Sequence, residues 1–238
     1  KSFNKSVVRI INFAPDSQVQ FFESLTFVSS KLESITIPSH VKEIRNLTFA
    51  GCMKLKNIKF LPDSELQTIQ FQAFSGTCIE SIEIPSSVTT LEEGWCDNMK
   101  ALINVKICEN NKRYKNLNDK IVIGKSDINN DNYDVLQFVS RDVKEFQIPS
   151  YIRIISSFSF YKSNIEKIDL PNEITIINSS AFQSCSKLKT FEIHPDSNLQ
   201  YIGQYCFAGT NIERIYFPKH LKIIERAVFL SSSLKYIE

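Results

Sequence analysis

Apolar residues recur along the chain at fixed positions within a unit of about 23 residues. A typical unit reads L-x-x-I-x-I-P-x-x-V-x-x-I-x-x-x-A-F-x-x-C-x-x, as in the stretch from Leu32 to Cys52. The units begin at Val8, Leu32, Leu55, Ile79, Leu102, Val143, Ile165, Leu188, Ile212 and Leu234. Units repeated at a period of 20–50 residues stack on their neighbours and bury a continuous core. We therefore predict a repeat array, and not a domain built around one central core.

Each unit predicts two short extended segments and a turn. The I-x-I step, as in Ile35 and Ile37, has strand periodicity with both branched side chains pointing inward. The proline that follows ends the strand, because it has no N–H to continue a ladder. The V-x-x-I step predicts a second extended segment, and A-F-x-x-C predicts a tight or helical turn. The recurring aromatic predicts a stacked core spine of Phe27, Phe49, Phe74, Phe160, Phe182, Phe207 and Phe229.

All eight prolines fall at one phase of this repeat. They are Pro15, Pro38, Pro62, Pro85, Pro149, Pro171, Pro195 and Pro218, spaced 22–24 residues apart except for one interval of 64. Pro15, Pro62 and Pro195 are followed by Asp-Ser and mark a longer turn in alternate repeats, whereas the others follow Ile or another apolar residue and mark a shorter Ile-Pro type turn. The chain therefore has a two-unit period of 46–47 residues, which duplication of a pair of repeats explains.

Two stretches carry a family resemblance. Ile35-Thr36-Ile37-Pro38-Ser39-His40-Val41 and Ile82-Glu83-Ile84-Pro85, with Ala73-Phe74-Ser75-Gly76, resemble the BspA-type leucine-rich repeat. The Pro-Asp-Ser-x-Leu-Gln-x-Ile unit is similar to the BspA-like surface families of mucosal protist parasites. The resemblance implies a right-handed solenoid that is mainly β, with parallel sheet ladders and short helical or 3-10 turns. It also implies a cell-surface or secreted adhesion protein.

The predicted organisation is a single leucine-rich repeat solenoid over residues 1–238, with repeat blocks 1–108 and 143–238 and a hairpin insertion at 109–142. At the join Cys108 replaces proline, and apolar runs at 121–123 and 135–139 flank a polar turn. Insertions in solenoids often serve binding, which makes Lys112, Arg113 and Tyr114 candidate contacts. The alternative is a spacer that seals the join between the blocks.

Composition narrows the function classes. The net charge of +2 argues against nucleic acid or an anionic membrane as partner, and no apolar run is long enough to insert into a bilayer. No nucleophile–base pair, phosphate loop or metal motif occurs, so we expect no enzyme, cofactor or metal. The turn Asp127-x-Asn129-x-Asp131 starts like a calcium loop but lacks the glycine and the last glutamate.

The six cysteines are expected to be buried thiols, because most of them occupy apolar or small positions of the repeat. The spacing also permits two disulfides, Cys52 with Cys78 and Cys185 with Cys206, because each pair lies at similar positions of successive turns.

The residue between the two inward apolars of each strand faces solvent. This binding column is predicted to comprise Thr36, Lys59, Glu83, Lys106, Gln147, Asp169, Glu192 and Tyr216. Its mixed charge fits a protein surface of mixed polarity better than a polyanion. The alternative is that the alternating charges only stabilise the pairing of neighbouring strands and bind no partner.

We expect a non-enzymatic protein-binding fragment of a longer, cell-surface or extracellular protein, monomeric, with a host matrix or cell-surface protein as ligand. An intracellular interaction scaffold and a structural surface coat are the alternatives. Sequons at Asn4, Asn46 and Asn178 are compatible with secretion but occur about as often as chance predicts.

Overall fold

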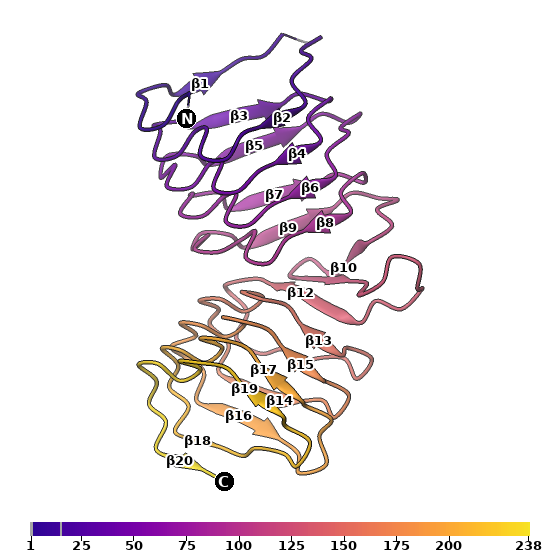
Figure 1. The fold of residues 1–238 in the computed structure, drawn as a ribbon, viewed down its shortest axis with the longest axis vertical. Coiled ribbons are helices and arrows are strands. Elements are labelled where there is room, and N and C mark those ends of the chain that lie inside the picture. The colour runs from indigo at the N-terminus through magenta and orange to yellow at the C-terminus, as the bar shows by residue number, and fades with distance from the viewer. Residues whose placement is uncertain (1, 15) are drawn as a thin grey trace. The chain divides into compact units, whose positions relative to one another are not determined.

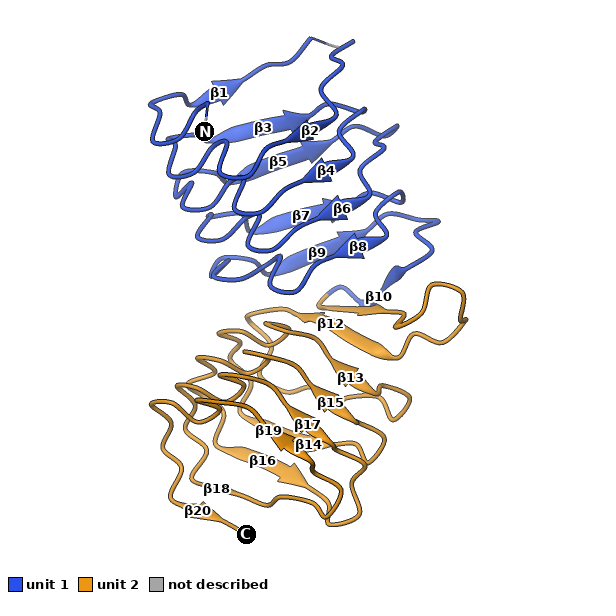
Figure 2. Cartoon of the chain, in the orientation of Figure 1, with its two compact units in different colours: residues 1–119 blue, residues 120–238 orange. Residues whose placement is uncertain are grey.

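A computed structural model describes residues 2–14 and 16–238 and divides the chain into two compact units, residues 1–119 and 120–238 (Figure 2). Every regular element in the described residues is a β-strand (Figure 1). In each unit the strands stack into parallel ladders, one turn of chain after another. The solenoid predicted from the repeat is thereby confirmed.

Unit 1 has two ladders on different sides of each turn. The long ladder contains β1 (Ile10–Ile11), β3 (Ser34–Ile37), β5 (Asn57–Phe60), β7 (Ser81–Ile84) and β9 (Asn104–Ile107). The short ladder contains β2 (Phe21–Phe22), β4 (Glu43–Ile44), β6 (Thr68–Ile69) and β8 (Thr90–Leu91). A further strand, β10 (Tyr114–Asn118), follows the last turn.

Unit 2 starts with the predicted hairpin, in which β11 (Ile121–Gly124) pairs antiparallel with β12 (Val135–Val139). Its short ladder continues from β12 through β13 (Ile154–Ile155), β15 (Ile176–Ile177), β17 (Tyr201–Ile202) and β19 (Ile223–Ile224). Its long ladder contains β14 (Lys167–Leu170), β16 (Thr190–Ile193), β18 (Arg214–Ile215) and β20 (Tyr236–Ile237). The predicted insertion 109–142 is thus divided between the units, and the single-domain organisation stays a prediction.

The repeat pattern explains where each strand ends. Ile82 and Ile84 are buried while Glu83 between them is exposed, as the alternation of a strand requires. β7 then stops at the residue before Pro85. The Ile-Pro turn closes with a bond from Val88 N–H to the carbonyl of the proline itself. In the Pro-Asp-Ser turn the acceptor lies one residue earlier, as in Ser64 N–H to Leu61 O.

The predicted aromatic spine is confirmed. Phe27, Phe49 and Phe74 stack in unit 1 with ring centroids 5.1 and 5.6 Å apart. In unit 2 the rings of Phe160, Phe182, Phe207 and Phe229 follow one another at 4.5, 5.5 and 5.4 Å. The rings are nearly parallel, and all but Phe229 are fully buried. One aromatic per turn therefore forms a continuous core in each unit.

The turn around each spine aromatic is not helical, so that part of the predicted fold is wrong. Leu47 and Gly51, two residues before and after Phe49, have φ values of 58° and 71°. The same left-handed pair, Ser180 and Ser184, flanks Phe182. A left-handed residue at every fourth position prevents a right-handed helical turn.

These turns instead form a third wall of the solenoid. The N–H groups of Leu47, Phe49 and Gly51 donate to carbonyls of the next turn at 3.1, 2.8 and 2.7 Å. The acceptors are the carbonyl groups of Phe71, Ala73 and Ser75.

Side chains after β9 close the end of unit 1. Asn116 accepts from Ile107 N–H at 2.8 Å and donates to Val105 O at 2.7 Å, as a peptide group of a further turn would. The Tyr114 hydroxyl accepts from Leu91 N–H at 2.9 Å. Tyr114 is buried, so its assignment as a ligand contact is corrected: it belongs to a cap. Terminal repeats need such caps because their core and backbone groups otherwise face water.

The cysteines are thiols, and four of them are buried as expected: Cys52, Cys96, Cys185 and Cys206. The Cys52 and Cys185 thiols donate to the spine carbonyls of Phe27 and Phe160, both at 2.9 Å. Burial raises the pKa of Cys52, and it raises the pKa of Cys185 to about 11. A buried thiol with a raised pKa is a poor nucleophile, so these residues serve packing.

Candidate protein-binding face

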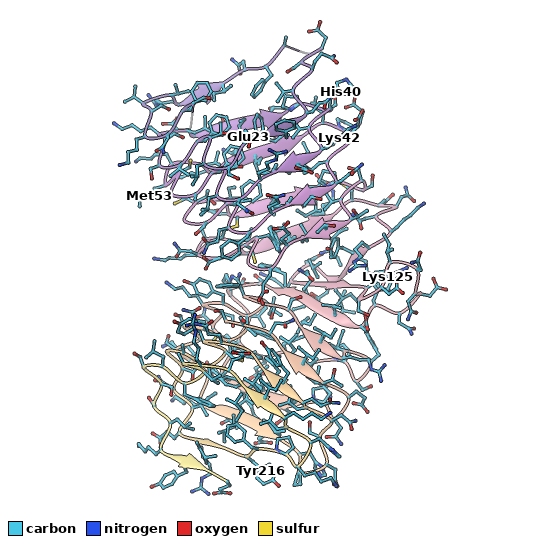
Figure 3. The ribbon with its side chains drawn as sticks, in the orientation of Figure 1. Glu23, His40, Lys42, Met53, Lys125 and Tyr216 are labelled. Atoms are coloured by element: carbon cyan, nitrogen blue, oxygen red, sulfur yellow. The ribbon has the colours of Figure 1, made fainter. Side chains whose placement is uncertain are left out.

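The binding column lies on the solvent side of the long ladder in each unit, with four residues in unit 1 and four in unit 2. All eight of its residues are exposed. Strand register places Thr36 beside Lys59, Glu83 beside Lys106 and Asp169 beside Glu192. Gln147 lies in segment 145–150, which has no assigned strand, and Tyr216 directly follows β18 near the C-terminal end of unit 2 (Figure 3).

Ion pairs fix part of this column. Lys106 Nζ lies 2.8 Å from Glu83 Oε1, and its hydrogen bond lowers the pKa of that carboxyl. Lys167, beside the column, bridges Asp169 at 3.2 Å and Glu192 at 3.0 Å. These two contacts raise the pKa of Lys167, with the Glu192 bond the larger cause. No ion pair of the described residues includes Lys59, which leaves its charge available on the surface.

The long ladder is interrupted, whereas the short ladder runs on. Within the described residues no backbone hydrogen bond joins β5 to β7, β16 to β18, or segment 145–150 to β14. On the short-ladder side the same turns stay paired, for example β6 with β8 and β17 with β19. In Figure 1, β5 and β7 accordingly lie farther apart than β3 and β5. The turns therefore separate on the side that carries the binding column.

Each interruption holds a hollow bordered by column residues. The hollow between β5 and β7 has a volume of about 560 Å³ and is bordered by Lys59 and Glu83. The one between β16 and β18 measures about 670 Å³ and includes Glu192 and Tyr216. The largest, about 1110 Å³, lies between segment 145–150 and β14 and includes Gln147 and Asp169. Six of the eight column residues thus border concave surface, whereas Thr36 and Lys106 line none of these three hollows.

The other candidate contacts are spread over the molecule. Lys112 is exposed and Arg113 half-buried, both in the cap segment before β10. The loop between β11 and β12 carries Lys125 (Figure 3), and Asp127 there accepts hydrogen bonds from the backbone and side chain of Asn129. The described residues hold no group of three or more metal-ligating side chains.

The three sequons differ in exposure. Asn46 is exposed, whereas Asn4 and Asn178 are half-buried. Asn46 is therefore the most accessible acceptor of the three.

Sequence reasoning missed the cap amides Asn111 and Asn116 and the carboxylates Glu145, Glu166 and Glu173, which border the largest hollow. The repeat pattern does not distinguish a separated pair of turns from a paired one, so it held no signal for the hollow. The Asn-x-x-Tyr-x-Asn spacing after Cys108 was a usable signal for the cap.

Stacked turns with two ladders and an aromatic spine define a leucine-rich repeat solenoid. A family model for the BspA type leucine rich repeat region matches residues 3–129 and 136–237, with six copies of the repeat. The chain belongs to this BspA-type leucine-rich repeat family. No match to a curated protein was found. Within the described residues there is no helix that could span a membrane.

Solved structures share the fold. The pneumococcal vaccine antigen PcpA aligns with a TM-score of 0.82 at 22% identity, covering 98% of this chain and 54% of PcpA. A leucine rich cell surface protein from Faecalibacterium prausnitzii aligns with a TM-score of 0.74 at 21% identity, covering 87% of this chain and 59% of that protein. A leucine-rich repeat protein from Eubacterium ventriosum gives 0.57 at 18% identity, with 88% and 79% covered. The chain therefore spans just over half the length of the first two.

Proposed function

We propose that this chain is a non-enzymatic binding module of a cell-surface or extracellular protein. Its binding column holds a protein ligand of the host cell surface or extracellular matrix. One observation carries the proposal: eight exposed residues of mixed character lie on the side where the turns separate, and six of them border hollows of about 560 to 1110 Å³. Concave surface that combines charged, polar and aromatic side chains suits a polar protein interface.

The location is supported by the neighbours. PcpA is described as a vaccine antigen and the Faecalibacterium prausnitzii protein as a cell surface protein. Antibody staining of unpermeabilised cells of the source organism should label their surface. Staining confined to the cytoplasm would contradict this location and favour an intracellular scaffold.

Binding is tested with the purified chain on a panel of immobilised extracellular-matrix and plasma proteins. Reversing the charges of Asp169 and Glu192 would place two further cations beside Lys167. Truncation to alanine of residues that form no ion pair is therefore preferable. The triple variant Lys59→Ala, Gln147→Ala, Tyr216→Ala should lower affinity for a captured protein at least about tenfold, because each truncation removes interface contacts.

The matched control removes the same residue types outside the binding column, through Lys100→Ala, Gln67→Ala and Tyr205→Ala. It should bind like the parent chain. Equal affinity of the column variant and the parent, or capture of no panel protein by the parent, would contradict the proposed ligand class.

A further inference from the structure

The largest of the three hollows is a groove with an apolar floor. It lies between the first turn of unit 2 and β14, and Ile148 and Leu170 are buried beneath it. Phe146, Pro149 and Pro171 line its half-buried walls. We name this surface, residues 145–150 and 166–173, the acidic groove.

Both ends of the groove are closed by backbone hydrogen bonds. Glu166 N–H donates to Lys144 O at 3.0 Å at one end, and Thr175 N–H donates to Arg153 O at 2.8 Å at the other. Between these two contacts no N–H of β14 donates to segment 145–150. The Pro149 carbonyl accepts from Ile152 N–H at 3.0 Å, but the other carbonyl oxygens of segment 145–150 receive no backbone donor from the described residues. They are therefore open to donors of a bound molecule.

The rim of the groove carries an excess of negative charge. Its ionisable residues are Glu145, Glu166, Asp169 and Glu173, with Lys167 as the single cation. Lys167 is already engaged by Asp169 and Glu192. Among the ion pairs of the described residues, none includes Glu145, Glu166 or Glu173. This local excess stands in a chain whose net charge is +2.

We propose that the acidic groove binds an extended basic segment of the protein partner, with an arginine or lysine side chain entering between the two walls; this rests on the proposed function. A guanidinium group has five N–H donors and no acceptor, which matches walls of carbonyl oxygens and carboxylates. The aliphatic stem of the same side chain packs against the apolar floor. The negative charges of the rim repel an acidic segment.

The hollow between β16 and β18 also favours a basic ligand. Glu192, Glu213 and Glu238 border it together with Asp169, which it shares with the acidic groove. Its cations, Lys189 and Arg214, are fewer than its carboxylates, and Arg214 pairs with Glu238 at 2.9 Å. A basic segment lying across β14 and β16 would therefore meet carboxylates in both hollows.

The test uses a labelled nine-residue peptide of alternating arginine and leucine, with matched peptides in which arginine becomes citrulline or glutamate. Fluorescence anisotropy should show saturable binding of the arginine peptide, and at least about tenfold weaker binding of both matched peptides. The variant Glu145→Gln, Glu166→Gln, Glu173→Gln should weaken the arginine peptide by a similar factor, because it removes three carboxylates and keeps their shape. Binding should also weaken as salt rises from 50 to 300 mM, since these charges are exposed.

The matched control carries the same change of net charge elsewhere, through Asp63→Asn, Asp119→Asn and Glu225→Gln. It should bind the peptide like the parent. The inference is overturned if the parent does not bind the arginine peptide, if citrulline binds equally well, or if groove variant and control behave alike.

Self-association is the other occupant to test. Sedimentation of the parent alone detects it, and dimerisation abolished by the groove variant would assign the groove to a second copy and overturn the inference. If panel proteins still need Lys59, Gln147 and Tyr216 but not the groove carboxylates, the groove proposal fails while the proposed function stands.

Discussion

The side-chain amide of Asn116 pairs with Ile107 as a backbone amide would, accepting its N–H at 2.8 Å while donating to Val105 O. Asn111 acts in the same way beside it, donating to the carbonyls of Pro85 and Val88. A stacked array is finished here by side chains in place of another turn. The N–H of Ile107 and the carbonyl of Val105 in β9, and the carbonyls of Pro85 and Val88, are thereby satisfied without a further repeat.

Removal of this cap should destabilise unit 1. Asn116→Ala leaves a donor and an acceptor of β9 without their partners, which costs about 1–3 kcal/mol. Tyr114→Phe removes the acceptor of Leu91 N–H and should cost about 1 kcal/mol. Urea unfolding followed by circular dichroism measures both. Lys112→Ala, an exposed change in the same segment, is the control and should leave the midpoint unchanged; an equal shift in the control would contradict the cap.

Truncation of a spine aromatic should be far more costly than truncation of an exposed one. Phe182 is fully buried between Phe160 and Phe207, so Phe182→Ala opens a cavity and should cost about 3–5 kcal/mol. Phe71→Ala, at a position 41% exposed, should cost under about 1 kcal/mol. Thermal melts of the two variants provide the comparison, and similar losses would show that the stacked ring does not hold neighbouring turns together.

The fold could be predicted from the sequence because every turn buries apolar side chains at the same positions of the repeat. The I-x-I and V-x-x-I spacings fix which side chains point inward, and the aromatic at one phase fixes the spine. The helical alternative for the turn around Phe49 was wrong, because Leu47 is not a residue type that signals a left-handed conformation. The backbone hydrogen bond from Leu47 to Phe71 in the next turn maintains the left-handed conformation. These residues are far apart in the sequence, so a local sequence pattern does not reveal the bond.

The binding column was predictable from alternation, but the groove was not. Gln147 and Asp169 were identified as solvent-facing, and they border the groove. The groove itself depends on whether segment 145–150 pairs with β14. Ile148-Pro149 and Leu170-Pro171 both fit the repeat, so the consensus offers no way to tell a separated turn from a paired one.

Two glycines of unit 2 should respond differently to alanine. Gly209 has a φ of +68° but ample space, since an added Cβ would lie 3.6 Å from Ser184 Cα. Gly209→Ala should therefore cost about 1–2 kcal/mol through backbone strain alone. At Gly203 the added Cβ would lie 2.4 Å from Ser179 N, so the neighbouring turn must move. Gly203→Ala should cost at least about 3 kcal/mol. Chemical denaturation of both variants tests the order, and a Gly203→Ala cost no larger than that of Gly209→Ala would refute the close approach of the turns.

Stability should fall at alkaline pH because of buried thiols. Burial raises the pKa of Cys185 from 9.0 to about 11 and that of Cys206 well above 9.0. Above pH 9 the unfolded thiol releases its proton while the folded thiol keeps it, so unfolding becomes more favourable. The stabilisation is fully present below pH 9 and is lost as pH rises toward 11, at about 1.4 kcal/mol per pH unit for each thiol. Urea unfolding under reducing conditions at pH 8, 9 and 10 should give a steeper loss in the parent than in Cys185→Ala. Identical slopes would mean that the Cys185 thiol is not protected from ionisation in the folded protein.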